Sequence, residues 1–248
     1  MPRPVTEPVT EALLVFVGVT LGIAALFQLS RFVPFVAEYL QVLVAALFLW
    51  LPAWLARRSG GELADFGFSL TGLGRSLRVG LLPLAAIFPL FLVGFVLYYQ
   101  LVYAQDAGPL AALRLPGRRF LGWDALSWER LAHVVDLGLL ESAFAQVVVV
   151  AIPEELFFRG YLQARFEQAW PAARRFAGGG VGRALVCSSL LFAISHVAVD
   201  LDPRRLAVFF PALLFGWMRS ATGSIVAGVA AHAAANLYID MLHRTFFR

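Results

Sequence analysis

The sequence has little charge, no lysine and a single cysteine. Charged residues make up 15% of the 248 residues and hydrophobic residues 60%, whereas a soluble domain is typically about a quarter charged and half apolar. Cys187 stands alone, which excludes an internal disulfide, and it lies in an apolar segment where a small buried residue fits. All 20 basic residues are arginine, and they form no basic stripe, so nothing indicates nucleic-acid binding. The composition therefore favours an integral membrane protein.

What the sequence does contain is a series of long apolar runs. About 20 residues cross the hydrocarbon core of a membrane as a helix. The first run is too long for the apolar part of a signal peptide and has no clear cleavage site. We predict an all-α fold, a polytopic membrane helical bundle of about seven transmembrane helices. The predicted spans are Ala12–Leu29, Phe35–Leu55, Val79–Tyr103, Leu137–Phe166, Ala184–Val199, Leu206–Met218 (which is short) and Thr222–Leu242.

Two polar stretches separate the early spans. Arg57–Arg78 is predicted to be a glycine-containing loop, and residues 104–136 are either an amphipathic segment on the membrane surface or a loop. The arginines divide almost evenly between the two sides, so the positive-inside rule favours a cytoplasmic N-terminus only slightly. We divide the chain into N-terminal transmembrane helices and loops, residues 1–136, and a helical core, residues 137–248. Together they are expected to form one structural unit.

Two adjacent carboxylates and an arginine end the apolar run of the fourth predicted span. Glu154, Glu155 and Arg159 follow Ala143–Ala151, in which only Gln146 is polar. Ionisable residues at membrane depth usually face a cavity or a partner. Glu155 and Arg159 are four residues apart and share a helix face, so they can pair. Glu154 points about 100° away and needs another partner, which leaves it available to accept a proton from water.

Two later predicted spans each carry a histidine with a companion residue on the same face. His196 lies four residues after Phe192, and His232 lies four residues before Asn236. Only alanines separate His232 from Asn236, and small residues let another helix approach closely. Two polar donors on one face can bind an oxyanion.

The three ionisable motifs lie at similar predicted depth. Glu154, His196 and His232 each lie 11 to 13 residues from an arginine at the same end of their spans, roughly 16 to 20 Å at the rise of an α-helix. A single site near the middle of the bilayer requires such a match.

Each member of the set has a structural alternative. The Glu155–Arg159 pair can be a structural ion pair, and a lone histidine in an apolar helix is usually a packing residue. Phe192 can belong to the core, and Gln146 can bond to a neighbouring helix. The combination of two carboxylates, an arginine and two histidines on three spans is more specific, and it predicts one shared site.

The ordered motifs resemble the CPBP family, which comprises the CaaX prenyl endopeptidases and the bacterial bacteriocin-processing (Abi) membrane proteases. The family pattern is Glu-Glu-x-x-x-Arg, then Phe-x-x-x-His, then His-x-x-x-Asn, and it is complete here. The matching residues are Glu154, Glu155, Arg159, Phe192, His196, His232 and Asn236. The resemblance covers roughly residues 140–242, and the N-terminal half matches only in spanning the membrane.

The resemblance implies an intramembrane endopeptidase, of a metallo- or glutamate-dependent type. Such an enzyme would hydrolyse a peptide bond of a membrane-associated protein or peptide, including a prenylated CaaX-type substrate. By carry-over, Glu154 and His196 would activate the attacking water, and His232 and Asn236 would hold the oxyanion.

The remaining motif residues receive supporting roles from the same resemblance. Glu155 and Arg159 would orient the first carboxylate, and Phe158 and Phe192 are assigned to substrate binding. The expected partners are membrane lipid and a peptide or protein substrate that enters from the membrane, with no nucleic acid. The expected location is a multi-pass position in the bacterial inner (cytoplasmic) membrane.

The metal requirement stays open at this point. The chain lacks His-Glu-x-x-His, the strong zinc signature. His196, His232 and Glu154 are the residues that would ligate zinc if a metal is used. Water activation by a glutamate needs no metal in principle, so we do not expect an obligatory one, and no cofactor is certain.

Other functions stay open beside proteolysis. A protein of the same fold can act as a non-proteolytic membrane scaffold or regulator, or as a bacteriocin self-immunity protein. Buried carboxylates and histidines also serve as proton relays in transporters. Against a transporter, we see no repeat between the two halves of the chain, of the kind many transporters have.

Overall fold

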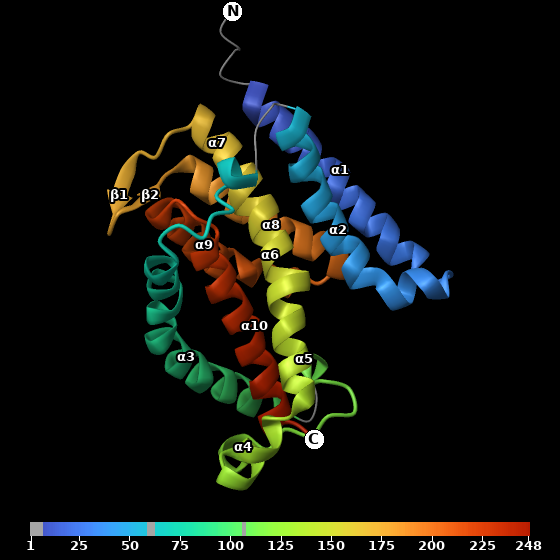
Figure 1. The fold of residues 1–248 in the computed structure, drawn as a ribbon. Coiled ribbons are helices and arrows are strands. Elements are labelled where there is room, and N and C mark those ends of the chain that lie inside the picture. The colour runs from blue at the N-terminus through green and yellow to red at the C-terminus, as the bar shows by residue number, and fades with distance from the viewer. Residues whose placement is uncertain (1–6, 59–62, 106–107) are drawn as a thin grey trace, which may run out of the picture.

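The computed structural model describes residues 7–58, 63–105 and 108–248, and these are mostly helical (Figure 1). The predicted all-α membrane bundle is confirmed. The main helices are α1 (Glu7–Leu29), α2 (Pro34–Arg58), α3 (Leu73–Ala104), α8 (Arg183–Asp200), α9 (Phe209–Thr222) and α10 (Val226–Phe246). Between them lie the short α4 (Trp128–Val134) and the 3-10 turns η1 (Leu63–Phe66), η2 (Ala111–Leu113), η3 (Gly122–Ala125) and η6 (Pro203–Val208).

The predicted fourth span is one helical stretch, Leu137–Ala169, whose winding changes along its length. It consists of α5 (Leu137–Ala145), the π-helical turn η4 (Gln146–Ala151), α6 (Ile152–Glu155), the π-helical turn η5 (Leu156–Gln163) and α7 (Ala164–Ala169). Pro153 lies in α6. A proline inside a helix removes one hydrogen bond and crowds the preceding turn, so the wider π turn before it relieves that crowding. π turns inside α-helices occur frequently at functional sites.

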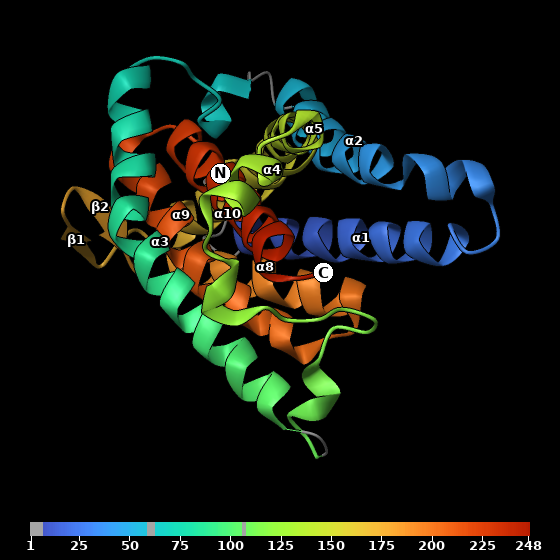
Figure 2. The same cartoon turned by 90° about the horizontal axis from the view of Figure 1, so that it is seen from below.

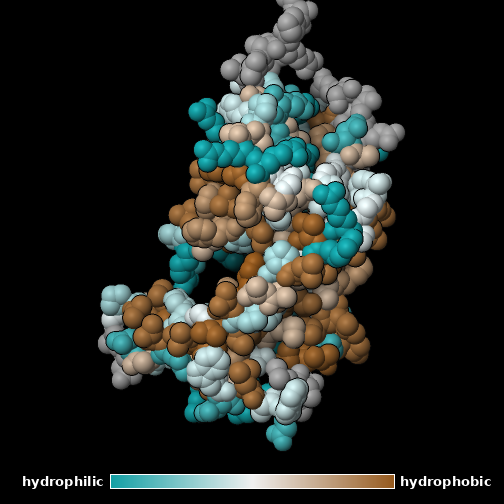
Figure 3. Space-filling view, turned by 90° about the vertical axis from the view of Figure 1, so that its left-hand side faces the viewer, coloured by the Kyte–Doolittle hydropathy of each residue, from teal (hydrophilic) through white to brown (hydrophobic). Residues whose placement is uncertain are grey.

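Among the residues that the structure describes, five helices are long and apolar enough to cross a membrane, so the chain is an integral membrane protein. They are Pro8–Leu29, Pro34–Leu55, Leu73–Ala104, Leu137–Ala169 and Arg183–Asp200. Figure 3 shows hydrophobic residues across most of the middle of one face, with hydrophilic residues gathered mainly near its ends. Of the last two predicted spans, α9 has 14 residues and is about 21 Å long, shorter than the hydrocarbon core. The polar side chains and many alanines of α10 lower its hydropathy, so the count of seven stays a prediction.

The helices that carry the motifs pack against one another inside the bundle. In Figures 1 and 2, α1 and α2 lie side by side on one flank and α3 lies on the other. Helix α10 packs against α3, α9, α5 and η4, whereas α8 packs against α9, η5 and α1. The largest core cluster is rich in aromatic residues and includes Phe16, Phe48, Phe157, Phe158 and Phe192. The long helix, α8 and α10 thus share one interior.

The start of α3 corrects the predicted boundary of the third span. The helix begins at Leu73 rather than Val79, so the predicted loop Arg57–Arg78 is partly helical. This first turn is held by tertiary packing: Ser76 is buried, and a Cβ atom on Gly80 would lie 2.5 Å from the carbonyl oxygen of Ala227 in α10. Local hydropathy contains no signal for that contact.

The last two helices are shifted towards the C-terminus relative to the predictions Leu206–Met218 and Thr222–Leu242. Residues 203–208 form η6, and each following helix continues four residues beyond its predicted end. Gly223, with φ of 73°, ends α9 in the left-handed region that favours glycine. The polar ends of both helices pack within the protein, and a prediction based on apolar runs cuts them short.

A small antiparallel hairpin follows α7, between the predicted spans Leu137–Phe166 and Ala184–Val199. It pairs β1 (Arg174–Phe176) with β2 (Gly179–Val181). The hairpin lies against α9, because the indole nitrogen of Trp217 donates a hydrogen bond to the Phe176 carbonyl at 2.8 Å. A Cβ atom on Gly179 would lie 2.3 Å from that nitrogen, so the close approach requires glycine.

Candidate active site

Glu155 lies at the centre of a buried polar cluster. Its side chain has no exposed surface and its Oε1 lies 3.2 Å from Nη1 of Arg159, one helical turn away. The same oxygen lies 3.0 Å from Nδ1 of His232 in α10. An ionised carboxylate can only accept hydrogen bonds, so Nδ1 of His232 carries the proton. Its Nε2 lies on the opposite edge of the ring, away from Glu155. The predicted Glu155–Arg159 pair is present, and it also holds His232.

Arg159 is buried and contacts several protein groups. It is 1% exposed, and its Nη2 donates to the carbonyl oxygen of Ala212 at 3.2 Å. Its guanidinium carbon lies 4.4 Å from the ring centre of Phe192 and 5.5 Å from that of Phe215. Arginine is favoured over lysine in buried, stacked sites of this kind, which indicates a fixed rather than a mobile cation.

Glu154 is placed differently from its neighbour. Its side chain is 16% exposed, and its Oε2 lies 3.8 Å from Nε2 of His232. That oxygen is buried and has no hydrogen-bond partner among the described residues. A separation of 3.8 Å is longer than a hydrogen bond, so Glu154 keeps one acceptor available beside the imidazole of His232.

Glu154 and His196 line the same pocket, which has a volume of about 130 Å³. Apolar side chains of α1 and α2 and the α8 residues Ser195, Val199 and Asp200 complete its wall. Nδ1 of His196 lies 2.9 Å from the carbonyl oxygen of Phe192, which can only accept, so this nitrogen carries a proton. The other ring nitrogen of a neutral His196 then has a free lone pair.

The side chain of Asn236 makes no described hydrogen bond to the carboxylates or imidazoles of this cluster. Its Nδ2 donates to Oε1 of Gln146 in η4 at 2.8 Å, and no described contact joins it to Glu154, Glu155 or His232. The alternative that Gln146 bonds to a neighbouring helix is therefore what the structure has. Asn236 retains one further N–H on the face of α10 that carries His232.

The two phenylalanines assigned to substrate binding are buried in the protein core. Phe158 is 1% exposed and Phe192 is 2% exposed, and their ring centres lie 4.9 Å apart. The ring of Phe192 also lies 4.5 Å from that of His196 and 6.0 Å from that of His232. Both phenylalanines support the polar cluster from behind, and direct contact with a substrate stays a prediction for them.

Residues that sequence reasoning missed also hold the cluster. Phe215 stacks on the imidazole of His232, with ring centres 5.1 Å apart and planes at 15°. A Cβ atom on Gly228 would lie 2.7 Å from Oε2 of Glu155, so α10 can pass the carboxylate only with glycine there. Gly228 lies four residues before His232, on the same helix face, and that spacing was a signal for it. Phe215 had no comparable signal.

The side chains do not form a ready metal site. Among the described residues, no three or more His, Cys, Asp or Glu side chains are grouped so as to hold a metal ion. Glu154 and His232 approach each other, but Nδ1 of His232 is occupied by Glu155, and a third donor does not join them.

Fold and site together define a class. The chain is a polytopic helical membrane protein with a carboxylate–histidine–arginine cluster buried between three helical segments. Residues 137–238 match the model of the Rce1-like family, described as type II CAAX prenyl endopeptidases. This match supports the CPBP family of CAAX proteases, as the motifs predicted, and at family level it supports an intramembrane endopeptidase. No curated protein and no solved structure matches the chain.

Proposed function

We propose that the protein hydrolyses a peptide bond of a membrane-associated substrate with a water molecule activated by Glu154 and His196. The observation that supports this most strongly is the position of the two acids. Oε1 of Glu155 contacts both Arg159 and His232, whereas the side chain of Glu154 lines a pocket together with His196 and has no hydrogen-bond partner at its Oε2 among the described residues. One acid is held for structure and the other is left for chemistry.

The proposed first step is proton transfer from water to Glu154. The water would lie between the Glu154 carboxylate and the free ring nitrogen of His196, which accepts its second hydrogen bond. Its oxygen attacks the carbonyl carbon of the scissile bond, and the proton held by Glu154 then passes to the leaving nitrogen. A positioned acid–base group of this kind typically contributes 10²–10⁴-fold to a rate.

We further propose that His232 and Asn236 stabilise the negative charge that develops on the carbonyl oxygen. The cluster of Glu154, Glu155 and Arg159 has two negative charges and one positive charge, so one proton shared with His232 makes it neutral. A protonated His232 donates from Nε2 towards the oxyanion while Glu155 balances its charge from the other side. The remaining N–H of Asn236 is the second proposed donor.

A prenylated substrate is favoured by an apolar pocket on the far side of His232. The pocket has a volume of about 420 Å³ and lies between α3, α9 and α10. Phe215 lines it and also stacks on His232, so a lipid chain in this pocket and a peptide bond at the cluster would be one side chain apart. We therefore propose that the lipid group of the substrate occupies this pocket.

The proposal is tested with the purified full chain in liposomes and a fluorescent prenylated peptide. We expect Glu154→Gln to lower the hydrolysis rate by at least about 10²-fold. Glu141→Gln, an exposed carboxylate on the same long helix, is the matched control and should retain full activity. Equal rates for wild type and Glu154→Gln would refute the assignment. Repeating the assay after removal of zinc with a chelator tests the metal, and we expect hydrolysis to persist.

The same variants separate proteolysis from the other open functions. A scaffold or an immunity protein would keep its cellular effect in the Glu154→Gln protein, with no hydrolysis by either form. A proton-coupled transporter would acidify or alkalinise the liposome interior with its solute and leave the peptide intact.

A further inference from the structure

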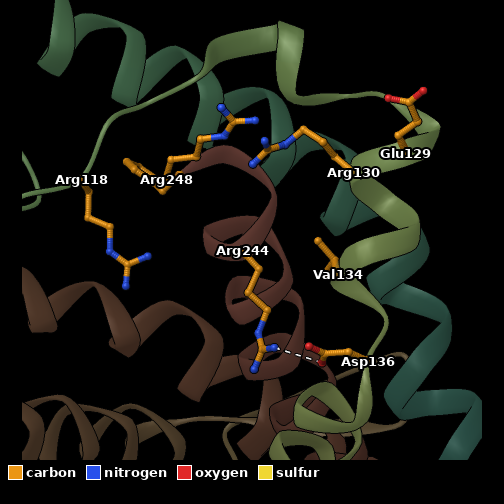
Figure 4. A pocket seen from close by; sticks show the side chains of 8 residues that line it. Arg118, Glu129, Arg130, Val134, Asp136, Arg244 and Arg248 are labelled. Carbon is orange, nitrogen blue, oxygen red and sulfur yellow. Dashed lines mark hydrogen bonds and ion pairs between the residues drawn. The ribbon is translucent and has the colours of Figure 1, made fainter.

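A second polar pocket lies at the end of the molecule where α10 ends, next to α4 and the start of α5 (Figures 1 and 4). It has a volume of about 570 Å³. Four arginines and two carboxylates line it, which leaves the lining side chains net positive. They are Arg118, Arg130, Arg244, Arg248, Glu129 and Asp136, and we refer to this site as the arginine pocket.

The arginine pocket is separate from the candidate active site. Arg244 lies twelve residues after His232 on α10, which is about 18 Å along the helix axis. None of the residues that line it belongs to the cluster around Glu154, His196 and His232.

Two of the arginines are fixed by protein contacts. Arg130 donates from Nε and Nη2 to the carbonyl oxygen of Thr245, at 3.2 and 3.0 Å. Arg244 pairs with Asp240 through Nε at 3.1 Å and with Asp136 through Nη1 at 3.3 Å. Because their guanidinium groups are already oriented, an anion that binds here would not have to order them.

The other two arginines are not neutralised. Within the described part of the chain, the side chains of Arg118 and Arg248 have no hydrogen bond or ion pair. Figure 4 shows the guanidinium groups of Arg248 and Arg130 turned towards each other, and that of Arg118 extended on the opposite side of the pocket. Like charges that converge repel one another. The two carboxylates of the pocket do not balance its four guanidinium groups, so an anion between them would reduce this repulsion.

The surroundings place the arginine pocket at the membrane boundary. The polar segment that contributes Arg118 and Arg130 joins two candidate spans, Leu73–Ala104 and Leu137–Ala169. Trp123 and Trp128 in this segment are 42% and 88% exposed, as expected for tryptophans at the level of lipid headgroups. Phosphate is the common anionic group at that level, and guanidinium groups bind it in a bidentate way.

We propose that the arginine pocket binds a phosphate-bearing anion, either the headgroup of an anionic phospholipid or a soluble phosphate. Arg130 and Arg244 form its fixed wall, and Arg118 and Arg248 close on the ligand. The bound anion would contact the C-terminal end of α10, the helix that carries His232.

The test measures thermal unfolding of the full chain in phosphatidylcholine nanodiscs in two arms. One arm adds phosphatidylglycerol to the nanodiscs, and the other adds inorganic phosphate against chloride at equal ionic strength. We expect a raised midpoint in at least one arm, and the arm that responds identifies the source of the phosphate. In the arm that responds, the double variant Arg118→Gln, Arg248→Gln should need at least about tenfold more phosphatidylglycerol or phosphate for half of the full midpoint shift. The reason is that charge-assisted hydrogen bonds to the ligand are lost.

Arg119→Gln is the matched control, since Arg119 is an exposed neighbour of Arg118 and does not line the pocket. Arg118 and Arg248 are chosen because their side chains hold no described contact, so the variants should fold like the wild type, which circular dichroism checks. No midpoint shift in either arm overturns the proposal. An equal loss of response in Arg119→Gln also overturns it, because the effect would then be general surface charge.

Discussion

At the scale of single residues, the neighbouring acids Glu154 and Glu155 have different roles because consecutive side chains of a helix point in different directions. Glu155 faces Arg159 and α10, and its Oε1 is contacted by two partners. Glu154 faces the pocket that His196 lines. This difference predicts that the same substitution destabilises the protein at Glu155 and leaves its stability almost unchanged at Glu154.

Glu155→Gln is expected to lower the free energy of unfolding by about 3 kcal/mol or more, because it leaves the buried guanidinium of Arg159 without its counter-charge. Glu154→Gln should change stability little, since the replaced oxygen has no hydrogen-bond partner among the described residues. Thermal or denaturant unfolding of both variants in the same nanodiscs measures the difference. Equal destabilisation by the two substitutions would contradict this division of tasks.

Contacts within one helix were predictable at this scale, and contacts between helices were not. The Glu155–Arg159 pair follows from a spacing of four residues. The bond from His232 to Glu155 joins residues 77 positions apart, and the bond from Asn236 to Gln146 joins residues 90 apart. These depend on the rotation and tilt of packed helices, which the hydropathy of a single chain does not determine.

At the scale of helices, α9 and α10 separate two cavities of different chemistry. The small pocket beside Glu154 and His196 opens between α1, α2 and α8, whereas the larger apolar pocket lies between α3, α9 and α10. Phe215 and His232 form part of the partition between the polar cluster and the apolar pocket. A substrate with one lipid group and one scissile bond would use both sides of this partition.

Filling the apolar pocket tests this arrangement. Ile87 lines the pocket from α3, so Ile87→Trp should raise KM for a prenylated peptide by about tenfold and change kcat little, because it removes binding without touching the reacting groups. Leu90→Trp is the control on the same helix, since Leu90 is 74% exposed and lies outside the pocket. If Ile87→Trp left KM unchanged, the lipid group would bind elsewhere.

The ends of helices α3, α9 and α10 could not be predicted from the sequence. The existence and order of the helices followed from apolar runs, but their ends depended on packing. Ser76 and Gly80 extend α3 by contact with the protein interior, and the hairpin around Gly179 is held by Trp217. Polar residues at helix ends resemble loop residues until their tertiary partners are known.

At the scale of the whole molecule, the β1–β2 hairpin and the segment near α4 lie at opposite ends of the bundle (Figure 1). If the bundle crosses the membrane along this direction, the two ends face different compartments. Arg175 in β1 and Arg119 near α4 are both exposed, so they report on the two ends.

A labelling experiment checks this orientation. In a Cys187→Ala background, Arg175→Cys and Arg119→Cys are introduced separately, and sealed vesicles are treated with a membrane-impermeant maleimide. We expect only one of the two cysteines to react until the vesicles are opened. Reaction of both in sealed vesicles would mean that the long axis of the bundle does not cross the bilayer.

The central claim is that the whole chain is a hydrolase whose chemistry depends on Glu154. The most direct measurement compares the protein termini in membranes of cells that express either the wild type or the Glu154→Gln protein at equal levels. We predict new termini on membrane-associated proteins in the wild-type sample alone, all within peptides that the purified enzyme also cleaves. Identical sets of termini in the two samples would contradict the claim.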